Sequence, residues 1–461
     1  MDVKYFKSDS DFLAKEWCYR RCNGGVDRIS ELPDEIILGI LSFLSLRECV
    51  TTSVLSSRWS DLWKHTPNLN LNAKLLTNHY QEPIQGHAWD AERCKYIEIV
   101  NSILQSHKAP SLKEFRISLY ANKSAQCAVA KWLEFVLSRH VERLILDLVC
   151  DDTRNSVSTY AVSLEELLRD RPQDLIGFKS LKSLRLKGFR VSGEAIDSFL
   201  CNCPLLEQLY IHGSFLTSDV VVCGTALRLK LFHIDNCYGS SENSIKVSAP
   251  NLTWLGVCAT LKLILENIPK LTRAYYTCPF PRPDYTKQFA SSVFSCVSRL
   301  QNLNLNLCST KVFLPNAIPQ MPNLKKLAVG YDGVAYEPVL QPVTALIRAS
   351  PRLQELKLQV ARPGRSHTTC KSGERHRHRH LKVFEFIGFF EREGDHIELL
   401  KYVLDNCAAL EKIILNCSSW SRFVYKLEAQ PRAARDRLEQ LLDGKVDDRI
   451  QLYITPSVRQ K

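Results

Sequence analysis

Residues 179–213 read KSLKSLRLKGFRVSGEAIDSFLCNCPLLEQLYIHG and contain one short apolar pattern twice. In each copy an apolar residue is followed by two variable positions, a second apolar residue, one variable position and a third apolar residue. The first copy is Leu181, Leu184 and Leu186, and the second is Leu206, Leu209 and Ile211. Between them, residues 193–202 have the length and apolar spacing of a helix. The stretch therefore predicts a strand, a helix and a second strand.

The same pattern returns from Leu112 to Leu415 and organises most of the chain. Further clear copies begin at Leu252, Leu300, Leu324 and Leu353, and weaker copies at Leu112, Val141, Leu229, Leu271, Leu381 and Leu410. Neighbouring copies such as those at Leu229 and Leu252, or at Leu324 and Leu353, start between 23 and 29 residues apart, which is the range of leucine-rich repeats. Further helices are expected over 341–350 and 395–406. A proline stands two residues before several copies, where we expect it to enter the strand: Pro204, Pro250, Pro269, Pro322 and Pro351.

Stacked copies predict a curved parallel sheet with helices on its outer side, an α/β solenoid. Side chains between the apolar positions then face the open, concave side. They mix cationic, amide and aromatic groups, which suits a protein-binding surface, although any solenoid also needs solvated residues there. The candidate target-binding residues are Arg185, Lys187, Gln208, Tyr210, His212, Trp254, Arg273, Tyr275, Asn302, Asn304, Asn306, Lys326, Glu355, Lys357 and Gln359.

The segment from Asp27 to Leu71 predicts three short helices by local rules alone. Pro33 suits the first position of a helix, where its missing N–H costs nothing. Ser45 and Glu48 form a capping box for the second helix, and Ser56 can cap the third. Trp59 and Trp63 then lie on one helical face. So small a unit has more large apolar side chains than it can hide, so some of them must meet a partner or the rest of this chain.

This segment resembles an F-box. The likeness rests on a Leu-Pro start at Leu32, an Ile-Leu pair at Ile40, the run Ser53-Val54-Leu55-Ser56-Ser57-Arg58-Trp59 and a final Trp63, in order and at the family's spacing. The resemblance implies docking onto the S-phase-kinase-associated adaptor, which joins the box to cullin and RING subunits. It assigns the docking surface, or its direct support, to Leu32, Pro33, Ile36, Ile37, Ile40, Leu41, Leu44, Val54, Leu55, Ser56, Arg58 and Trp59; we expect Trp63 in the core.

The C-terminal part from Leu381 resembles the FBD module that follows the repeats in many plant F-box proteins. Phe384, Phe386, Phe389 and Phe390, and then Gly394-Asp395 before a helix, carry the likeness. We interpret the module as a cap on the last repeats. Before it, Arg and His alternate over 375–380; three histidines on one strand face could bind a metal, but the interleaved arginines favour a flexible basic linker.

Composition limits the remaining function classes. The net charge of +12 could suit nucleic acid or an acidic protein, but no RNA-binding motif interleaves aromatic and basic residues, so nucleic acid is not the expected partner. No catalytic motif is present, and neither a metal nor a cofactor is expected. The seventeen dispersed cysteines read as reduced, mostly structural thiols. Without a signal sequence or an apolar span, we expect the chain inside the cell, in the nucleus or the cytoplasm.

These observations predict a non-catalytic substrate-recognition subunit of an adaptor–cullin–F-box ubiquitin ligase. A leucine-rich scaffold that is not coupled to ubiquitination is the alternative. The expected organisation is an N-terminal segment over 1–26, the F-box over 27–71, a connecting segment over 72–110, leucine-rich repeats over 111–360, the basic linker over 361–380 and the FBD module over 381–455.

Overall fold

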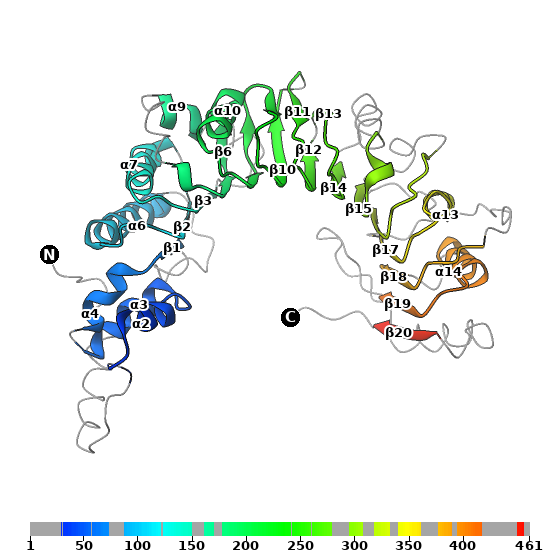
Figure 1. Cartoon of the computed structure of the whole chain (residues 1–461), viewed down its shortest axis with the longest axis horizontal. Helices are drawn as coiled ribbons and strands as arrows, with labels where there is room; N and C mark the ends of the chain where they lie inside the picture. The colour runs from blue at the N-terminus through cyan, green and yellow to red at the C-terminus, as the bar shows by residue number, and fades with distance from the viewer. Residues whose placement is uncertain are drawn as a thin grey trace, which may run out of the picture. The chain divides into compact units, whose positions relative to one another are not determined.

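The computed structural model describes residue 29 and residues 31–56, 58–72, 87–120, 123–149, 161–169, 178–240, 242–259, 261–278, 295–307, 318–331, 340–360, 377–389, 394–416 and 450–455. The chain divides into two compact units, Met1–Phe215 and Leu216–Lys461. In each unit, parallel strands form a sheet and α-helices lie along one side of it (Figure 1). The α/β class and the leucine-rich-repeat architecture predicted from the sequence are therefore confirmed.

The first unit begins with the F-box helices. They are α2 (Asp34–Leu41), α3 (Leu46–Thr51) and α4 (Trp59–Leu62), with the short 3-10 helices η2 (Thr52–Val54) and η3 (Trp63–His65). The predicted capping box is present: Oγ of Ser45 accepts from the amide of Glu48 at 3.3 Å, and the Glu48 carboxylate accepts from the amide of Ser45 at 2.7 Å. Pro33 is the N-cap of α2 and not its first helical residue, because its ψ of 149° is extended.

Repeats follow directly. The strands of the first unit are β1 (Asn68–Asn72), β2 (Glu114–Tyr120), β3 (Arg143–Val149), β4 (Val162–Ser163), β5 (Ser183–Lys187), β6 (Phe189–Val191) and β7 (Gln208–His212). The two-residue β8 (Phe215–Leu216) contains the boundary between the units. The other helices of the first unit are α6 (His87–Ser106), η4 (Lys123–Ala125), α7 (Gln126–Leu137), α9 (Leu164–Arg169) and α10 (Gly193–Asn202). The parallel sheet runs β1, β2, β3, β5, β7. Its first strand, β1, ends at Asn72 and pairs with β2, so the sheet starts earlier than the repeats predicted from residue 111.

The second unit contains a longer parallel series of strands. They are β10 (Leu231–Gly239), β12 (Trp254–Ala259), β14 (Arg273–Cys278), β15 (Asn302–Leu307), β16 (Lys326–Tyr331), β17 (Glu355–Val360), β18 (Val383–Ile387), β19 (Lys412–Asn416) and β20 (Gln451–Thr455), each paired with the next. Its helices are η6 (Val297–Arg299), α13 (Leu340–Ala349) and α14 (Gly394–Asn406). The helices expected at 341–350 and 395–406 are thus confirmed within a residue.

A second, smaller sheet replaces helices in part of this unit. It consists of β9 (Val220–Cys223), β11 (Ser244–Ser248) and β13 (Lys262–Glu266), with β11 in the middle. The sequence analysis did not identify it. These short strands place buried apolar residues at alternate positions, as the repeat strands do, so periodicity does not separate the two sheets.

The core follows the repeat pattern. Leu184, for example, pairs with Leu144 on one side and Leu209 on the other, and all three are fully buried. Burying one such side chain contributes about 1.5 to 3 kcal/mol, and the stack repeats the contact at every strand. We expected the prolines that precede the repeats to enter the strands, but they lie in the turns before the strands. These are Pro204, Pro250, Pro269, Pro322 and Pro351. A turn tolerates proline because no ladder hydrogen bond is required there.

Candidate functional site

The F-box presents a group of exposed apolar side chains, which we call the F-box apolar face. Its members and their exposed fractions are Ile36 (52%), Ile40 (40%), Phe43 (90%), Leu44 (37%) and Val54 (50%). Phe43 lies in the turn that follows α2, and Val54 ends η2. Because exposed large apolar side chains are costly in water, several of them on one small unit indicate a surface that a partner covers.

Other predicted docking residues fill the interior of the F-box. Ile37, Leu41 and Trp59 are at most 3% exposed, so they support the apolar face from beneath and do not offer a contact surface themselves. Trp63 is 4% exposed and packs inside, as expected. A helix places residues three and four apart on one side, and therefore Ile37 and Leu41 face the core while Ile36 and Ile40 face away.

The remaining members of the predicted set are exposed or partly buried, and two of them make hydrogen bonds. Leu32 and Leu55 are half-buried, and Pro33 is exposed. Oγ of Ser56 accepts a hydrogen bond from the amide of Trp59 at 3.4 Å, but the N-cap of α4 is Arg58 and not Ser56 as predicted. Arg58 Nε donates to Oδ1 of Asp34 at 2.9 Å and so joins α4 to the start of α2. Arg58 therefore stabilises the F-box at its surface.

Phe43 is the residue that the sequence analysis missed. It is not among the docking residues predicted from the sequence, yet it has the greatest exposure of the exposed large apolar side chains described. The available signal was its position just beyond the end of α2 at Leu41 and three residues after Ile40, which is itself exposed.

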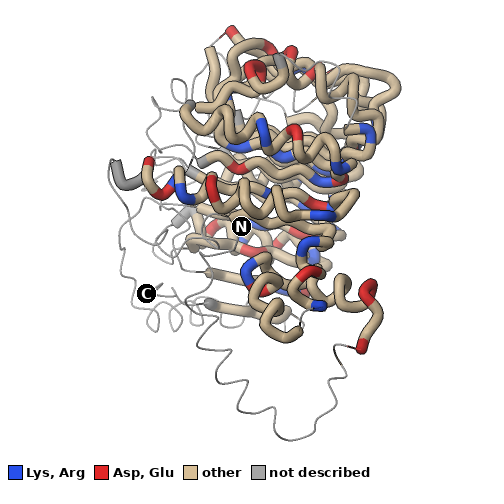
Figure 2. Tube along the Cα trace, turned by 90° about the vertical axis from the view of Figure 1, so that its left-hand side faces the viewer, with Lys and Arg blue, Asp and Glu red and all other residues tan. Residues whose placement is uncertain are grey.

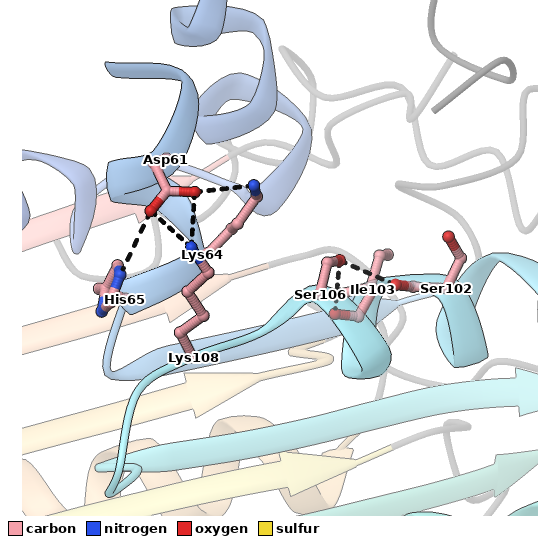
Figure 3. A network of polar contacts seen from close by, with 7 residues as sticks. All are labelled: Asp61, Lys64, His65, Ser102, Ile103, Ser106 and Lys108. Atoms are coloured by element: carbon pink, nitrogen blue, oxygen red, sulfur yellow. Dashed lines mark hydrogen bonds and ion pairs between the residues drawn. The ribbon is translucent and has the colours of Figure 1, made fainter. Parts of the chain in front are cut away.

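A polar network joins the F-box to the first repeat (Figure 3). Lys108, which follows α6, donates from Nζ to both carboxylate oxygens of Asp61, at 3.0 and 2.8 Å, and Lys64 donates to Oδ1 at 2.8 Å. These hydrogen bonds hold the pKa of Asp61 well below its usual range. Next to it, the buried His107 lies 3.0 Å, through Nε2, from the carbonyl oxygen of Thr66. The two contacts fix the end of α6 against the last helical turn of the F-box.

The open face of the first unit carries the predicted residues on β5 and β7. Arg185 and Gln208 are exposed, and Lys187, Tyr210 and His212 are half-buried, while the residues between them are buried. The guanidinium of Arg185 lies 4.4 Å from the centre of the Tyr210 ring, and Lys187 pairs with Asp147 at 3.0 Å. Figure 2 shows basic and acidic residues interspersed along the described part of the chain.

The open face of the second unit carries the remaining predicted target-binding residues. In register across β12, β14, β15, β16 and β17 stand Trp254, Arg273, Asn302, Lys326 and Glu355. A second row across the same strands lies two residues further along and contains Gly256, Tyr275, Asn304, Ala328 and Lys357. A third row, two residues further again, includes Asn306 and Gln359. Lys326 pairs with Glu355 at 2.8 Å and Lys357 with Glu385 at 3.0 Å. The two lysines are thereby neutralised within the face.

The basic linker expected at 361–380 requires a correction at its end. Residues 361–376 lie outside the described part of the chain, but His378 is buried and begins the next repeat. Its Nε2 lies 2.9 Å from the carbonyl oxygen of Ser350, and Nδ1 accepts from the amide of Leu381 at 3.1 Å. Both ring nitrogens therefore hold the turn before β18, a structural role that a linker would not have.

The FBD-like residues continue the same sheet. Phe384, Phe386 and Phe389 are fully buried, and the rings of Phe386 and Phe389 meet edge to face with centroids 5.3 Å apart. His396 on α14 packs against both rings, and its burial lowers the pKa to about 4. Phe390 lies outside the described residues. Residues 381–416 thus extend the repeats with β18, α14 and β19.

Several buried cysteines of the described residues are poorly reactive. Burial raises the pKa of Cys203, Cys258 and Cys407 to about 12, so these thiols stay protonated and are poor nucleophiles. Within the described ranges, no group of three or more His, Cys, Asp and Glu side chains could hold a metal ion. Nor is any described helix both long and apolar enough to cross a membrane.

Comparisons with known proteins agree on two domains. The F-box domain model matches residues 29–71, and the model described as the At1g61320/AtMIF1, LRR domain, matches residues 103–460. Among curated proteins of Arabidopsis thaliana, the F-box/FBD/LRR-repeat protein At4g26340 is 28% identical over 84% of this chain and 91% of its own length. The F-box/FBD/LRR-repeat protein At3g52680 is 30% identical over 72% of this chain and 71% of its own.

A shorter relative and a solved structure complete the comparison. The F-box/LRR-repeat protein At3g26922 of the same plant is 30% identical over 56% of this chain and 84% of its own. A chain from the crystal structure of the TLR13–ssRNA13 complex aligns with 68% of this chain, which spans only 47% of that chain, at 15% identity and a TM-score of 0.23. A similarity that low carries no argument about function.

Proposed function

Because this chain belongs to the F-box proteins that carry a leucine-rich-repeat domain of the At1g61320/AtMIF1 type, we propose that it is the substrate-recognition subunit of an adaptor–cullin–F-box ubiquitin ligase. In this proposal residues 27–71 dock the S-phase-kinase-associated adaptor, and the adaptor connects them to the cullin and RING subunits. The repeats over 111–360 bind a target protein, and residues 381–455 continue and close the sheet. The complex would act in the nucleus or the cytoplasm.

One observation carries the proposal: the F-box apolar face is exposed although the helices beneath it are folded and have their own core. Interface hot spots consist of a few large side chains that become fully desolvated on binding. Phe43, at 90% exposure, has the most surface to lose. Covering it and its four neighbours with an apolar groove of the adaptor would provide most of the binding free energy.

The chain itself would perform no chemistry. Its contribution is to hold a target next to the catalytic subunits, which raises the effective concentration of the target's lysines there. The ordered junction at Asp61 and His107 supports this role within the first unit, because it fixes the F-box on the first repeats. A rigid junction limits the volume that the first repeats can sample relative to the adaptor.

The test is a binding titration of the purified full chain with the adaptor. We expect saturable binding by the parent and a loss of at least tenfold in affinity for Ile40→Asp and for Phe43→Asp. Val221→Asp is the matched control, because Val221 is also apolar and 42% exposed but lies on β9 of the second unit. Circular dichroism should show that all three variants are folded. A folded parent that does not bind the adaptor would contradict the proposal and favour a scaffold that is not coupled to ubiquitination.

A further inference from the structure

Three aromatic side chains meet on the open face of the second unit, and Gly256 makes their arrangement possible. Trp254 stands on the same face of β12 as Gly256, two residues earlier. A Cβ atom at position 256 would lie 2.8 Å from Cζ3 of Trp254 and 2.6 Å from Cδ2 of His233, closer than real contacts allow. The indole ring therefore rests on the bare backbone of Gly256, where any other residue would displace it.

The neighbouring rings enclose this position from both sides. In the register of the sheet, His233 on β10 and Tyr275 on β14 stand on either side of Gly256. The His233 ring meets the Trp254 ring edge to face, with centroids 5.1 Å apart, and meets the Tyr275 ring in the same way at 6.2 Å. Edge-to-face pairs of this kind contribute about 0.5 to 1.5 kcal/mol each beyond the area they bury. We call this group, His233, Trp254 and Tyr275, the aromatic platform.

The platform is ordered before any partner arrives. Trp254 and Tyr275 remain half-exposed, so their rings still present surface to a ligand. Side chains that already occupy their bound positions lose little conformational entropy on binding, which is a main cost of association. Tryptophan and tyrosine are also the residue types most enriched at energetic hot spots.

A cation stands next to the platform. Arg273 is exposed, shares a strand with Tyr275, and is in register with Trp254 on one side and Asn302 on the other. Among the described residues its guanidinium has no ion-pair or hydrogen-bond partner, whereas Lys326 and Lys357 of the same face are paired with Glu355 and Glu385. Arg273 is thus available to an external anion, and its planar guanidinium can bind a carboxylate through two parallel hydrogen bonds.

We propose that the aromatic platform and Arg273 together bind an extended acidic peptide segment of the target, with an aromatic or large aliphatic side chain on the rings and a carboxylate on Arg273. This inference rests on the proposed target-binding role of the repeats and specifies the chemistry that they recognise. The amides of Asn302 and Asn304, on the adjacent strand, are placed to hydrogen-bond the peptide backbone that continues past the carboxylate. The charge pattern disfavours nucleic acid, which requires a continuous positive groove along its phosphates; here the neighbouring lysines are neutralised.

The test is selection of a random dodecapeptide library on the purified full chain without the adaptor. We expect the selected peptides to share an aromatic or large aliphatic residue within two positions of Asp or Glu. Trp254→Ala should weaken their binding at least tenfold. With Arg273→Glu, the enriched peptides should contain Lys or Arg in place of Asp or Glu. A merely structural role of Arg273 would not produce this change. Arg352→Glu is the control, because Arg352 is an exposed arginine in the turn before β17 and should leave the selection unchanged.

Three results would overturn the inference: no enriched peptides, peptides that bind Trp254→Ala and Arg273→Glu as well as the parent, or displacement of the peptides by a 20-nucleotide oligouridine. Adaptor binding is measured on the same preparation. Failure of adaptor binding alone would contradict the proposed ligase role, while the peptide selection would still report on the platform.

Discussion

Lys108 donates from Nζ to both carboxylate oxygens of Asp61, at 3.0 and 2.8 Å, across 47 residues of sequence. Asp61 belongs to the last α-helix of the F-box and Lys108 to the segment that leads from α6 into the first full repeat. The amide of Lys108 also donates to the carbonyl oxygen of Lys64 at 2.8 Å. Side chain and backbone of one residue therefore join the F-box to the repeats.

Replacing Asp61 with Asn should weaken this junction modestly. The Asp61 side chain is 45% exposed, so the solvent screens the ion pairs and their loss should cost about 1 kcal/mol or less. The cost should shrink further in 1 M NaCl. Urea unfolding, monitored through the hydrogen exchange of residues 58–72, would measure this loss of stability. Glu398→Gln, which removes an ion pair within α14 only, should leave that segment unchanged.

Acidification should destabilise the junction through His107. Burial lowers the pKa of His107 to about 4, below the ordinary value of 6.5. The unfolded chain therefore binds more protons between those two values, so the free energy of unfolding falls as the pH drops from about 6.5 to about 4 and levels off below. The loss is at most about 3 kcal/mol. Nδ1 of His107 is buried without a hydrogen-bond partner among the described residues, which explains why a proton there is unfavourable.

The variant His107→Gln separates protonation of His107 from loss of its hydrogen bond, because the glutamine amide can still donate to the Thr66 carbonyl but does not titrate. Thermal unfolding of the F-box junction should then change less between pH 7 and pH 4.5 than in the parent. His396 would still contribute to the pH dependence of the second unit, since its pKa is also lowered to about 4. An unchanged pH dependence around residues 58–72 would refute the assignment to His107.

Replacing the neighbouring residues Ile36 and Ile37 of α2 should have different effects on stability and on adaptor binding. Ile37 is fully buried, so Ile37→Ala should cost about 2 to 4 kcal/mol through lost burial and the cavity left behind. Ile36 is 52% exposed, and Ile36→Ala should change stability by less than about 0.5 kcal/mol while weakening adaptor binding. Hydrogen exchange of residues 31–56 and a binding titration distinguish the two effects. Similar exchange rates in both variants would contradict the division between core and surface.

Replacing Gly388 and Gly39 with alanine should have opposite effects on stability. Gly388 has a φ of +78°, and a Cβ there would overlap the carbonyl oxygen of Val360, so Gly388→Ala should destabilise the second unit by more than about 1 kcal/mol. Gly39 lies within α2, and apart from its chain neighbours and the backbone of its own helix no atom lies within 4 Å of its added Cβ. Gly39→Ala should therefore stabilise the F-box by up to about 1 kcal/mol. Thermal melts of both variants beside the parent would measure the difference.

Local sequence signals predicted most of the elements correctly. The capping box at Ser45, the helix over 193–202 and the strand at every copy of the apolar pattern all depend on neighbours within a few residues, so periodicity was sufficient. Such signals did not distinguish β9, β11 and β13 from repeat strands. They also did not find β1, whose NLNLN run alternates like the others but was assigned to the end of the F-box.

The sequence by itself determined that this protein carries an F-box and parallel leucine-rich repeats, because those patterns specify which side of each element is buried. Only the tertiary structure decided that Phe43 is exposed while Ile37 and Leu41 are covered, and that His378 holds a turn. It also decided that Trp254 rests on Gly256 between His233 and Tyr275. The physical reason is that exposure and ring contacts depend on residues brought together from distant strands and helices, and periodicity along one strand contains no information about its neighbours.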